Sequence, residues 1–196
     1  MDYPRTPAAS PVKKLMMLFV IVILALAAIT LTSGHPALAA SAATIDREAD
    51  AALAKLMETT PVAKMLAGQA KGILIFPNIV KAGFIVGAQY GDGALKIKGK
   101  TEGYYNMVAA SYGLQAGAQS FAYAMFFMTD AAMNYFKKSE GFEVGVGPSV
   151  VVVDAGVAKS LTTTTAQSDV YSFIFGQEGL MAGLGVQGSK ITRINP

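Results

Sequence analysis

The sequence offers few of the side chains that carry out enzyme chemistry. Its 196 residues include no cysteine, no tryptophan and one histidine, His35. Thiolate nucleophiles, imidazole acids and bases, and zinc sites built from these ligands are therefore missing from the sequence after residue 39. This composition argues against most classes of enzyme and points to packing and surface contact.

The remaining groups with catalytic potential form no recognisable pattern. Carboxylates are scattered after residue 39, and none falls into a metal-ligand or glycosidase spacing. The same part of the sequence lacks the Ser-x-x-Lys and Gly-x-Ser-x-Gly arrangements that activate a serine nucleophile. We therefore expect no catalytic residue, no metal site and no cofactor, and predict that the protein is not an enzyme.

One glycine motif is typical of dinucleotide binding, but its context is not. Residues 183–188 read Gly-Leu-Gly-Val-Gln-Gly and satisfy G-x-G-x-x-G. That motif works only when a helix follows it and an acidic residue lies about 20 residues further on. Eight residues follow Gly188 in this sequence, so we expect these glycines to serve strand packing.

The first 39 residues have the pattern of an export signal. Lys13 and Lys14 precede an apolar run at residues 15–31, and Ala37-Leu38-Ala39 follows as a cleavage motif. We predict a signal peptide over residues 1–39 and a periplasmic or cell-envelope location. The apolar run is long for a signal peptide and short for a membrane span, so an uncleaved inner-membrane anchor at residues 15–31 remains the alternative.

Removing the leader changes the charge of the chain. Residues 1–39 contain three basic residues and one acid, so the formal net charge of +3 falls to +1. Nucleic acid is therefore not an expected partner. Residues 40–196 are enough for one domain with its own core, and the lack of cysteine means that no disulfide supports it.

Two helices are predicted at the start of this domain. From Thr44 to Thr59 apolar residues recur at helical spacing, with charged residues on the other face and Thr44 as a candidate N-cap. Thr60-Pro61 begins a second helix that ends near Gly68. The apolar face of the first helix could pack on a sheet, which is its commoner fate, or lie in a membrane surface.

The rest of the domain is predicted to be mostly strand. Residues 73–76 and 83–91 read as strands joined by a turn at Pro77-Asn78, and a buried segment is expected at residues 121–128. A short helix is expected at residues 131–138, followed by strands at 144–147, 149–153 and 170–175. The predicted fold class is α+β, with N-terminal amphipathic helices packed on a glycine-rich, predominantly antiparallel curved sheet or barrel and one short helix inserted.

Three lysines alternate along one segment of this region. Lys96, Lys98 and Lys100 are separated by single residues, so a strand here would place three ammonium groups on one face. A solvated or edge strand explains such a pattern. Contact with an anionic surface is the alternative.

Several short motifs occur in an order that resembles the SYLF lipid-binding domain family. The first are residues 70–77 (AKGILIFP) and 81–87 (KAGFIVG), followed by Tyr105-Asn106 and residues 111–120 (SYGLQAGAQS). The later ones are residues 126–129 (FFMT), 142–145 (FEVG) and 175–183 (FGQEGLMAG). The resemblance extends over about residues 44–194, so it implies a single SYLF-like domain at residues 40–196.

The resemblance implies a non-enzymatic domain that binds phospholipids, with phosphoinositides as the ligands of eukaryotic members. It also implies that an N-terminal amphipathic helix and nearby basic residues meet the membrane. The candidate headgroup contacts are Lys71 and Lys81, which lie inside the matched motifs, and then Lys64 and Lys55. The candidate membrane-contact residues on the helix are Ile45, Leu53, Leu56 and Met57.

The function expected from the sequence is binding of anionic phospholipid or phosphoinositide-type headgroups at a membrane surface by an exported bacterial envelope protein. Some eukaryotic SYLF proteins also bind actin, and we do not expect this partner for an exported bacterial protein. A structural envelope protein that acts through protein contacts or self-association is the alternative. The sequence leaves the oligomeric state open.

Overall fold

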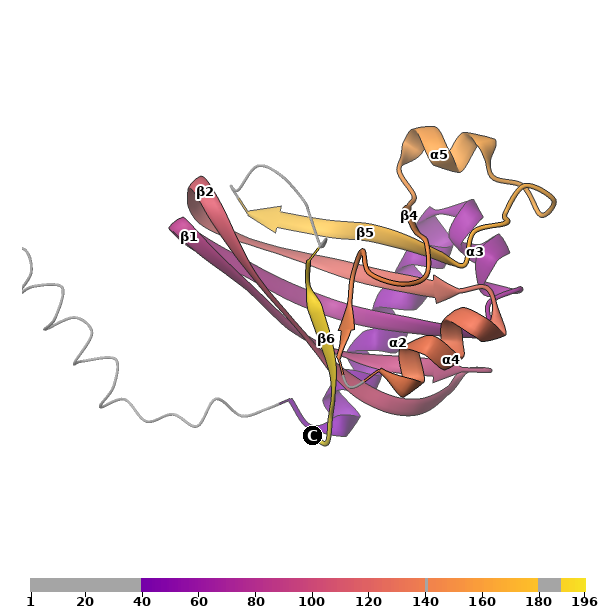
Figure 1. Cartoon of the computed structure of the whole chain (residues 1–196), viewed down its shortest axis with the longest axis horizontal. Helices are drawn as coiled ribbons and strands as arrows, with labels where there is room; N and C mark the ends of the chain where they lie inside the picture. Colours follow the sequence, from indigo (N-terminus) through magenta and orange to yellow (C-terminus); the bar gives the residue numbers. More distant parts are fainter. Residues whose placement is uncertain (1–39, 140, 180–187) are drawn as a thin grey trace, which may run out of the picture. The chain divides into compact units, whose positions relative to one another are not determined.

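The computed structural model of the chain describes residues 40–139, 141–179 and 188–196 (Figure 1). The predicted leader at residues 1–39 and most of the Gly183–Gly188 motif lie outside the described residues. The elements are α2 (Ala42–Thr59), α3 (Pro61–Ala67), β1 (Gly72–Ile97), β2 (Lys100–Phe127), α4 (Asp130–Lys138), β3 (Phe142–Glu143), β4 (Val150–Val152), α5 (Ala155–Ser160), β5 (Val170–Gly179) and β6 (Lys190–Ile194).

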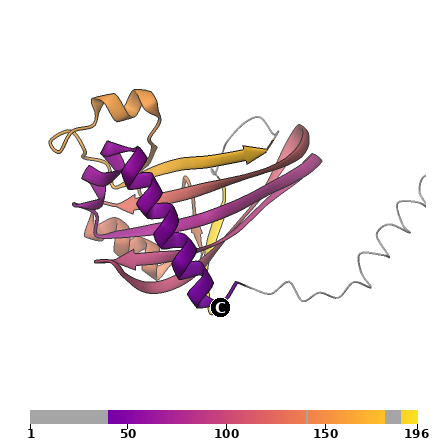
Figure 2. The same cartoon turned by 180° about the vertical axis from the view of Figure 1, so that it is seen from behind.

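The described strands form one curled sheet centred on β2. β1 pairs with β2 along one edge, whereas β6 and β5 pair with different parts of its other edge. These pairings and that of β3 with β6 are antiparallel, and the short β4 is parallel to β5. The sheet forms a half-barrel with α2 on one side and α4 on the other (Figures 1 and 2). This confirms the predicted α+β class with helices on a curved, mostly antiparallel sheet.

β1 and β2 are the two strands of one long hairpin, which we call the ribbon. Their register runs from Gly72 opposite Phe127 to Ile97 opposite Lys100, and Lys98 and Gly99 form the turn. Both turn residues have positive φ, 51° and 76°, as a two-residue type I′ turn requires. The predicted strand with three lysines on one face is therefore wrong, because Lys98 occupies the turn.

The ribbon folds back on itself, and two glycines make this possible. A Cβ on Gly93 would overlap the carbonyl oxygen of Ile75, and a Cβ on Gly91 would lie 2.8 Å from the carbonyl oxygen of Asn78. The second half of β1 thus crosses directly over its first half. Both strands bend back in the middle of the ribbon. The bend lies on the side of the molecule away from α4 (Figures 1 and 2).

Each face of the ribbon's base contributes to a separate hydrophobic core. Leu74, Phe76 and Phe127 pack with α4. The ring centroids of Phe136 and Phe127 lie 5.0 Å apart, with the rings tilted by 40°. The intervening Ile75 and Phe126 pack with α2 and α3 on the opposite side. This alternation, with a period of two residues, is the reason that residues 121–127 are buried throughout, as the sequence predicts.

The helices agree with the periodicity of the sequence, with small differences at their ends. α2 begins two residues before the predicted start, because Ser41 rather than Thr44 is the N-cap and accepts a hydrogen bond from the Thr44 amide. α3 follows at Pro61 as expected. α4 is capped by the Thr129 hydroxyl, which accepts from the Ala132 amide.

Two predicted local structures differ in the fold, and one helix was not predicted. Pro77-Asn78 is a bulge inside the continuous strand β1 rather than a turn, because the register shifts between Phe76 and Ile79. Residues 144–147 form turns and bends instead of a strand. The second short helix, α5, follows Asp154, whose carboxylate accepts from the Gly156 and Val157 amides. Nothing in the apolar periodicity of this short segment indicates a helix.

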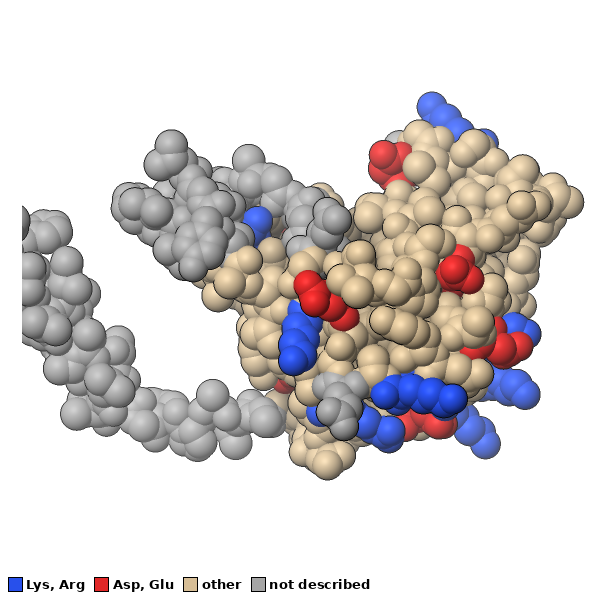
Figure 3. All heavy atoms as spheres, viewed as in Figure 1, with Lys and Arg blue, Asp and Glu red and all other residues tan. Residues whose placement is uncertain are grey.

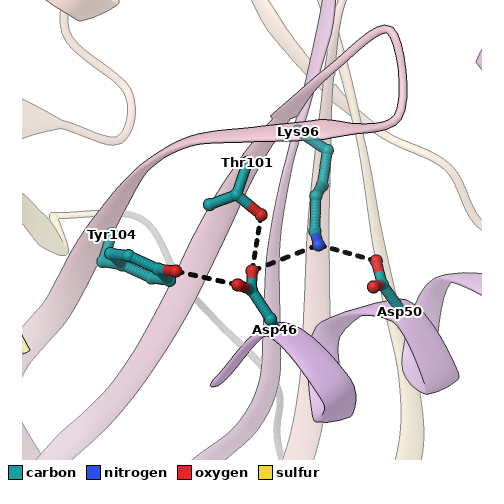
Figure 4. A network of polar contacts seen from close by, with 5 residues as sticks. All are labelled: Asp46, Asp50, Lys96, Thr101 and Tyr104. Carbon is teal, nitrogen blue, oxygen red and sulfur yellow. Dashed lines mark hydrogen bonds and ion pairs between the residues drawn. The ribbon is translucent and has the colours of Figure 1, made fainter. Parts of the chain in front are cut away.

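A polar network fastens α2 to the turn end of the ribbon (Figure 4). The Lys96 ammonium lies 3.2 Å from Asp46 Oδ1 and 2.8 Å from Asp50 Oδ1, one helical turn further along α2. Thr101 donates to Asp46 Oδ1, and the Tyr104 hydroxyl donates to Asp46 Oδ2 at 2.8 Å. The Lys96 side chain is 7% exposed, so this lysine is an internal partner of α2 rather than a surface cation.

The network shifts the titration of both of its central groups. Burial alone would raise the pKa of Asp46, but the hydrogen bonds from Thr101, Tyr104 and Lys96 outweigh it and lower the pKa. Burial would likewise lower the pKa of Lys96, but Asp50 and Asp46 outweigh it and raise the pKa. Folding therefore favours the charged form of each partner.

A methyl group at the crossing of the ribbon should destabilise the fold. We predict that Gly93→Ala lowers the free energy of unfolding by about 1–3 kcal/mol or more, because its Cβ meets backbone that cannot move aside. Gly68→Ala is the matched control, since its Cβ would lie 3.5 Å from the nearest atom at a φ of −67°. Urea unfolding of both variants tests this. Equal stability of the two would contradict the close crossing.

The Asp46 network should make the free energy of unfolding decrease at acid pH, and we call this decrease the acid limb. Because folding lowers the pKa of Asp46 below its ordinary value of 3.8, its contribution is present above that pH and is lost as the pH falls through the folded-state pKa. We predict that Asp46→Asn costs about 1–3 kcal/mol at pH 7 and flattens this acid limb. The exposed Asp50→Asn should cost less than about 1 kcal/mol. Urea unfolding of each variant at pH values between about 2 and 7, a range that includes the pKa of an aspartate, measures its free energy of unfolding. A full acid limb in Asp46→Asn would refute the assignment.

Candidate functional site

Two of the four lysines selected from the sequence are open to a ligand. Lys55 is exposed on α2, and Lys64 is exposed in the last turn of α3. Within the described residues, neither ammonium group forms an ion pair at 4.0 Å or less. Both therefore keep their charge available to an anionic group.

The other two lysines have different surroundings. Lys71 is exposed but forms an ion pair with Asp130 at 3.5 Å, at the start of α4. Lys81 is only 6% exposed, on the inner face of the ribbon opposite Gln119. The structure thus does not bring the four lysines together in one open cluster, and Lys81 is part of the interior.

The apolar face of α2 packs on the sheet. Ile45 and Leu56 are fully buried in the core that contains Ile75 and Phe126, and Leu53 packs against the same core. Met57 is partly buried. Of the two fates that the sequence leaves open for this face, packing on the sheet is the one observed.

A cavity of about 300 Å³ lies beside Lys55, between α2 and the ribbon. Two irregularities of the strands lie at its wall: the bulge at Pro77-Asn78 in β1 and a bulge in β5 between Phe175 and Glu178, opposite Ala122 and Ser120 of β2. Its walls contain apolar and polar groups, a positive charge on Lys55 and a negative charge on Glu178. The lining residues are Ala52, Lys55, Pro77, Asn78, Ser120, Phe121, Ala122, Phe175, Gly176 and Glu178.

Sequence reasoning found Lys55 but missed the cavity. A proline inside a predicted strand region was the available signal, because proline in a strand marks an edge or a bulge. The bulge in β5 has a comparable mark, Gly176, whose φ of 61° suits a glycine. The cavity can bind a polar group through Lys55 and an apolar segment through Phe121 and Phe175.

Charge on the visible surface is mixed. On the face in Figure 3, lysine and arginine side chains lie beside acidic ones instead of forming a patch of one sign. No group of three potential metal ligands occurs among the described residues. Within the same residues, no helix has the length and apolar character needed to cross a membrane.

Comparison with known families identifies the second half of the domain. Residues 108–195 match the model of the Ysc84 family, described as Las17-binding protein actin regulators. No curated protein matches the chain. The match covers β2 from Val108 onward and all later elements, whereas the SYLF motifs at residues 70–77 and 81–87 precede it.

The matched residues contain the later SYLF motifs in the expected order, from residues 111–120 to residues 175–183. The family is associated with lipid binding and actin regulation. The resemblance found in the sequence is therefore confirmed over residues 108–195, which are similar to the Ysc84 (SYLF) domain family.

Proposed function

We propose that this protein binds anionic phospholipid headgroups, of which phosphoinositides are one type, at a membrane surface without catalysing a reaction. The observation that carries the proposal is the ammonium of Lys55, which forms no ion pair within the described residues, at a cavity of about 300 Å³ with partly apolar walls. The association of the family with lipid binding supports it.

The chemistry of the cavity suits part of a phospholipid. A phosphate gains a charge-assisted contact with Lys55, and Asn78 and Ser120 can donate hydrogen bonds to its oxygens. Phe121 and Phe175 provide an apolar wall for the adjoining carbons. The volume is at the small end for ligand sites, which suits a headgroup rather than a whole lipid.

Lys64 adds a second cation on the neighbouring helix. A lysine near an anionic membrane surface contributes about 1 kcal/mol to binding. Glu178 lines the same cavity as Lys55 and opposes this attraction. The affinity for anionic lipid therefore depends on Lys55 and Lys64 together, less the repulsion from Glu178.

Export to the cell envelope is also part of the proposal. It is supported by Lys13-Lys14, the apolar run at residues 15–31 and the Ala37-Leu38-Ala39 motif. An envelope location makes phospholipid available and separates the protein from cytoplasmic actin. We therefore propose lipid rather than actin as the partner of this member of the family.

Loss of Lys55 and Lys64 should weaken membrane binding. We predict that Lys55→Gln/Lys64→Gln lowers affinity for anionic vesicles about 25-fold, from about 1 kcal/mol for each lysine. Co-sedimentation with anionic and zwitterionic vesicles measures this. Lys159→Gln, which removes an exposed lysine from α5, is the control and should change affinity little. Lys81→Glu is not informative here, because burying a carboxylate at this position would disturb the fold.

The same experiment distinguishes the competing function. Equal binding to anionic and zwitterionic vesicles, or none, would refute the proposal. A concentration-dependent increase in mass without vesicles would then favour a structural protein that acts through self-association.

Export should leave a defined N-terminus. We predict that the full chain, expressed in a bacterium and recovered from the envelope fraction, begins at Ala40, because the small residues at Ala37 and Ala39 fit signal peptidase. N-terminal sequencing tests this. An intact Met1 in the membrane fraction would favour the anchor at residues 15–31, and recovery in the cytoplasm would refute export.

A further inference from the structure

The far end of the ribbon has an unusual distribution of polar residues. We call residues 80–90 of β1 and 108–120 of β2 the ribbon tip; the ribbon bends back at this end (Figures 1 and 2), and its register shifts between Phe84 and Val86. On the described part of its inner face the buried side chains are polar: Lys81, Gln89 and Gln119. On its outer face the exposed side chains are mostly apolar.

The outer face is built from cross-strand pairs of uncharged residues. Tyr90, 54% exposed, lies opposite Val108, 43% exposed. Ala82 faces Ala118 and Ala88 faces Ala110, and all four are exposed. Val80, 47% exposed, continues the same row. Water-facing strands normally show the opposite order, with apolar residues inside and polar residues outside.

Charged residues are missing from the tip apart from the buried Lys81. The sequence contains no Asp, Glu, Lys or Arg at residues 82–91 or 103–129. The register shift within the tip falls at Phe84, Ile85 and Val86, which are uncharged. The nearest other charges stand at the base, where Asp92 follows in β1, Glu178 pairs with Ser120, and Lys190 pairs with Val108.

Along β1, the lengths of the two arms of the tip bracket the thickness of one leaflet of a bilayer. At about 3.3 Å per residue, the distance along β1 from residue 85 is about 13 Å to Lys81 and about 23 Å to Asp92. The hydrocarbon core of a bilayer is about 30 Å thick, so one leaflet is about 15 Å. Strand segments that face lipid show this same order, with apolar residues outward and polar residues inward.

We infer that the ribbon tip inserts into the hydrocarbon of one leaflet and is the part of the protein that contacts acyl chains. The inference rests on the proposed function and adds to it the depth and the element of contact. The backbone groups of the tip that face each other are hydrogen-bonded between β1 and β2, which removes that part of the cost of moving the tip out of water. Tyr90 stands near the base of the tip, where a tyrosine suits the boundary between hydrocarbon and headgroups.

A single tryptophan can report insertion directly, because the chain contains none. Tyr90→Trp, in the full chain otherwise unchanged, should show a blue-shifted emission with anionic vesicles and quenching by lipids brominated on their acyl chains. Tyr135→Trp is the matched control, since Tyr135 is also exposed but lies on α4 at the base of the ribbon. It should show neither effect.

Adding positive charge to the outer face of the ribbon tip distinguishes insertion into hydrocarbon from attraction to anionic headgroups. Ala82→Lys/Ala88→Lys adds two positive charges at exposed positions, so it should fold normally, yet it should bind vesicles about tenfold or more weakly. Ala131→Lys/Asn134→Lys adds the same charge at exposed positions of α4 and should bind as well as the unchanged protein or better. Circular dichroism and thermal unfolding verify the fold of each variant.

The other results would overturn the inference in distinguishable ways. If Tyr90→Trp shows no shift and the tip lysines strengthen anionic binding, insertion is refuted while headgroup binding stands. If the unchanged protein binds no vesicle, both proposals fail. If the Tyr90→Trp emission shifts with protein concentration alone and the tip lysines abolish this shift, the tip is a contact between copies of the chain.

Discussion

The fold depends on the crossing of the ribbon over itself. Without side chains at Gly91 and Gly93, the second half of β1 can lie directly on the backbone of Ile75 and Asn78. This crossing brings the turn end of the ribbon back to its beginning, where Gly72 lies close to Leu95 and Ile97. It also places Lys96 and Thr101 beneath α2, so the acids of the helix have partners. The bulges that accompany the bend leave the cavity beside Lys55.

The same bend separates the ribbon into two regions with different surroundings. Near its base both faces are covered, one by α2 and α3 and the other by α4, so the base is apolar on both sides. Beyond the reach of the helices, the outer face is exposed and uncharged while the inner face holds Lys81, Gln89 and Gln119. A soluble surface would be expected to carry charge at these outward positions. The order is thus the reverse of the usual one for a strand that faces water.

The elements were largely predictable from the sequence, because the periods of 3.6 and 2 residues are local properties. The helices at residues 42–59, 61–67 and 130–138 and the buried strand at residues 121–127 follow from them. The crossing was not predictable, since alternation in β1 reads the same in a flat or a folded ribbon. The burial of Lys96 shows the same limit: its neighbours in sequence resemble those of Lys98 and Lys100. The acids that pair with it, Asp46 and Asp50, lie on a helix about 50 residues away.

The packing of α2 determines which groups are free to contribute to the membrane binding that we propose. Ile45 and Leu56 are already out of water, and burying such a side chain contributes about 1.5–3 kcal/mol. Moving them from the sheet into hydrocarbon would add little, because one apolar surrounding replaces another. The move would also expose Ile75 and Phe126 and break the contacts of Lys96 with both acids. Lys55, Lys64 and the outer face of the ribbon tip are in contact with water in the folded protein, so binding to lipid through them requires no loss of structure.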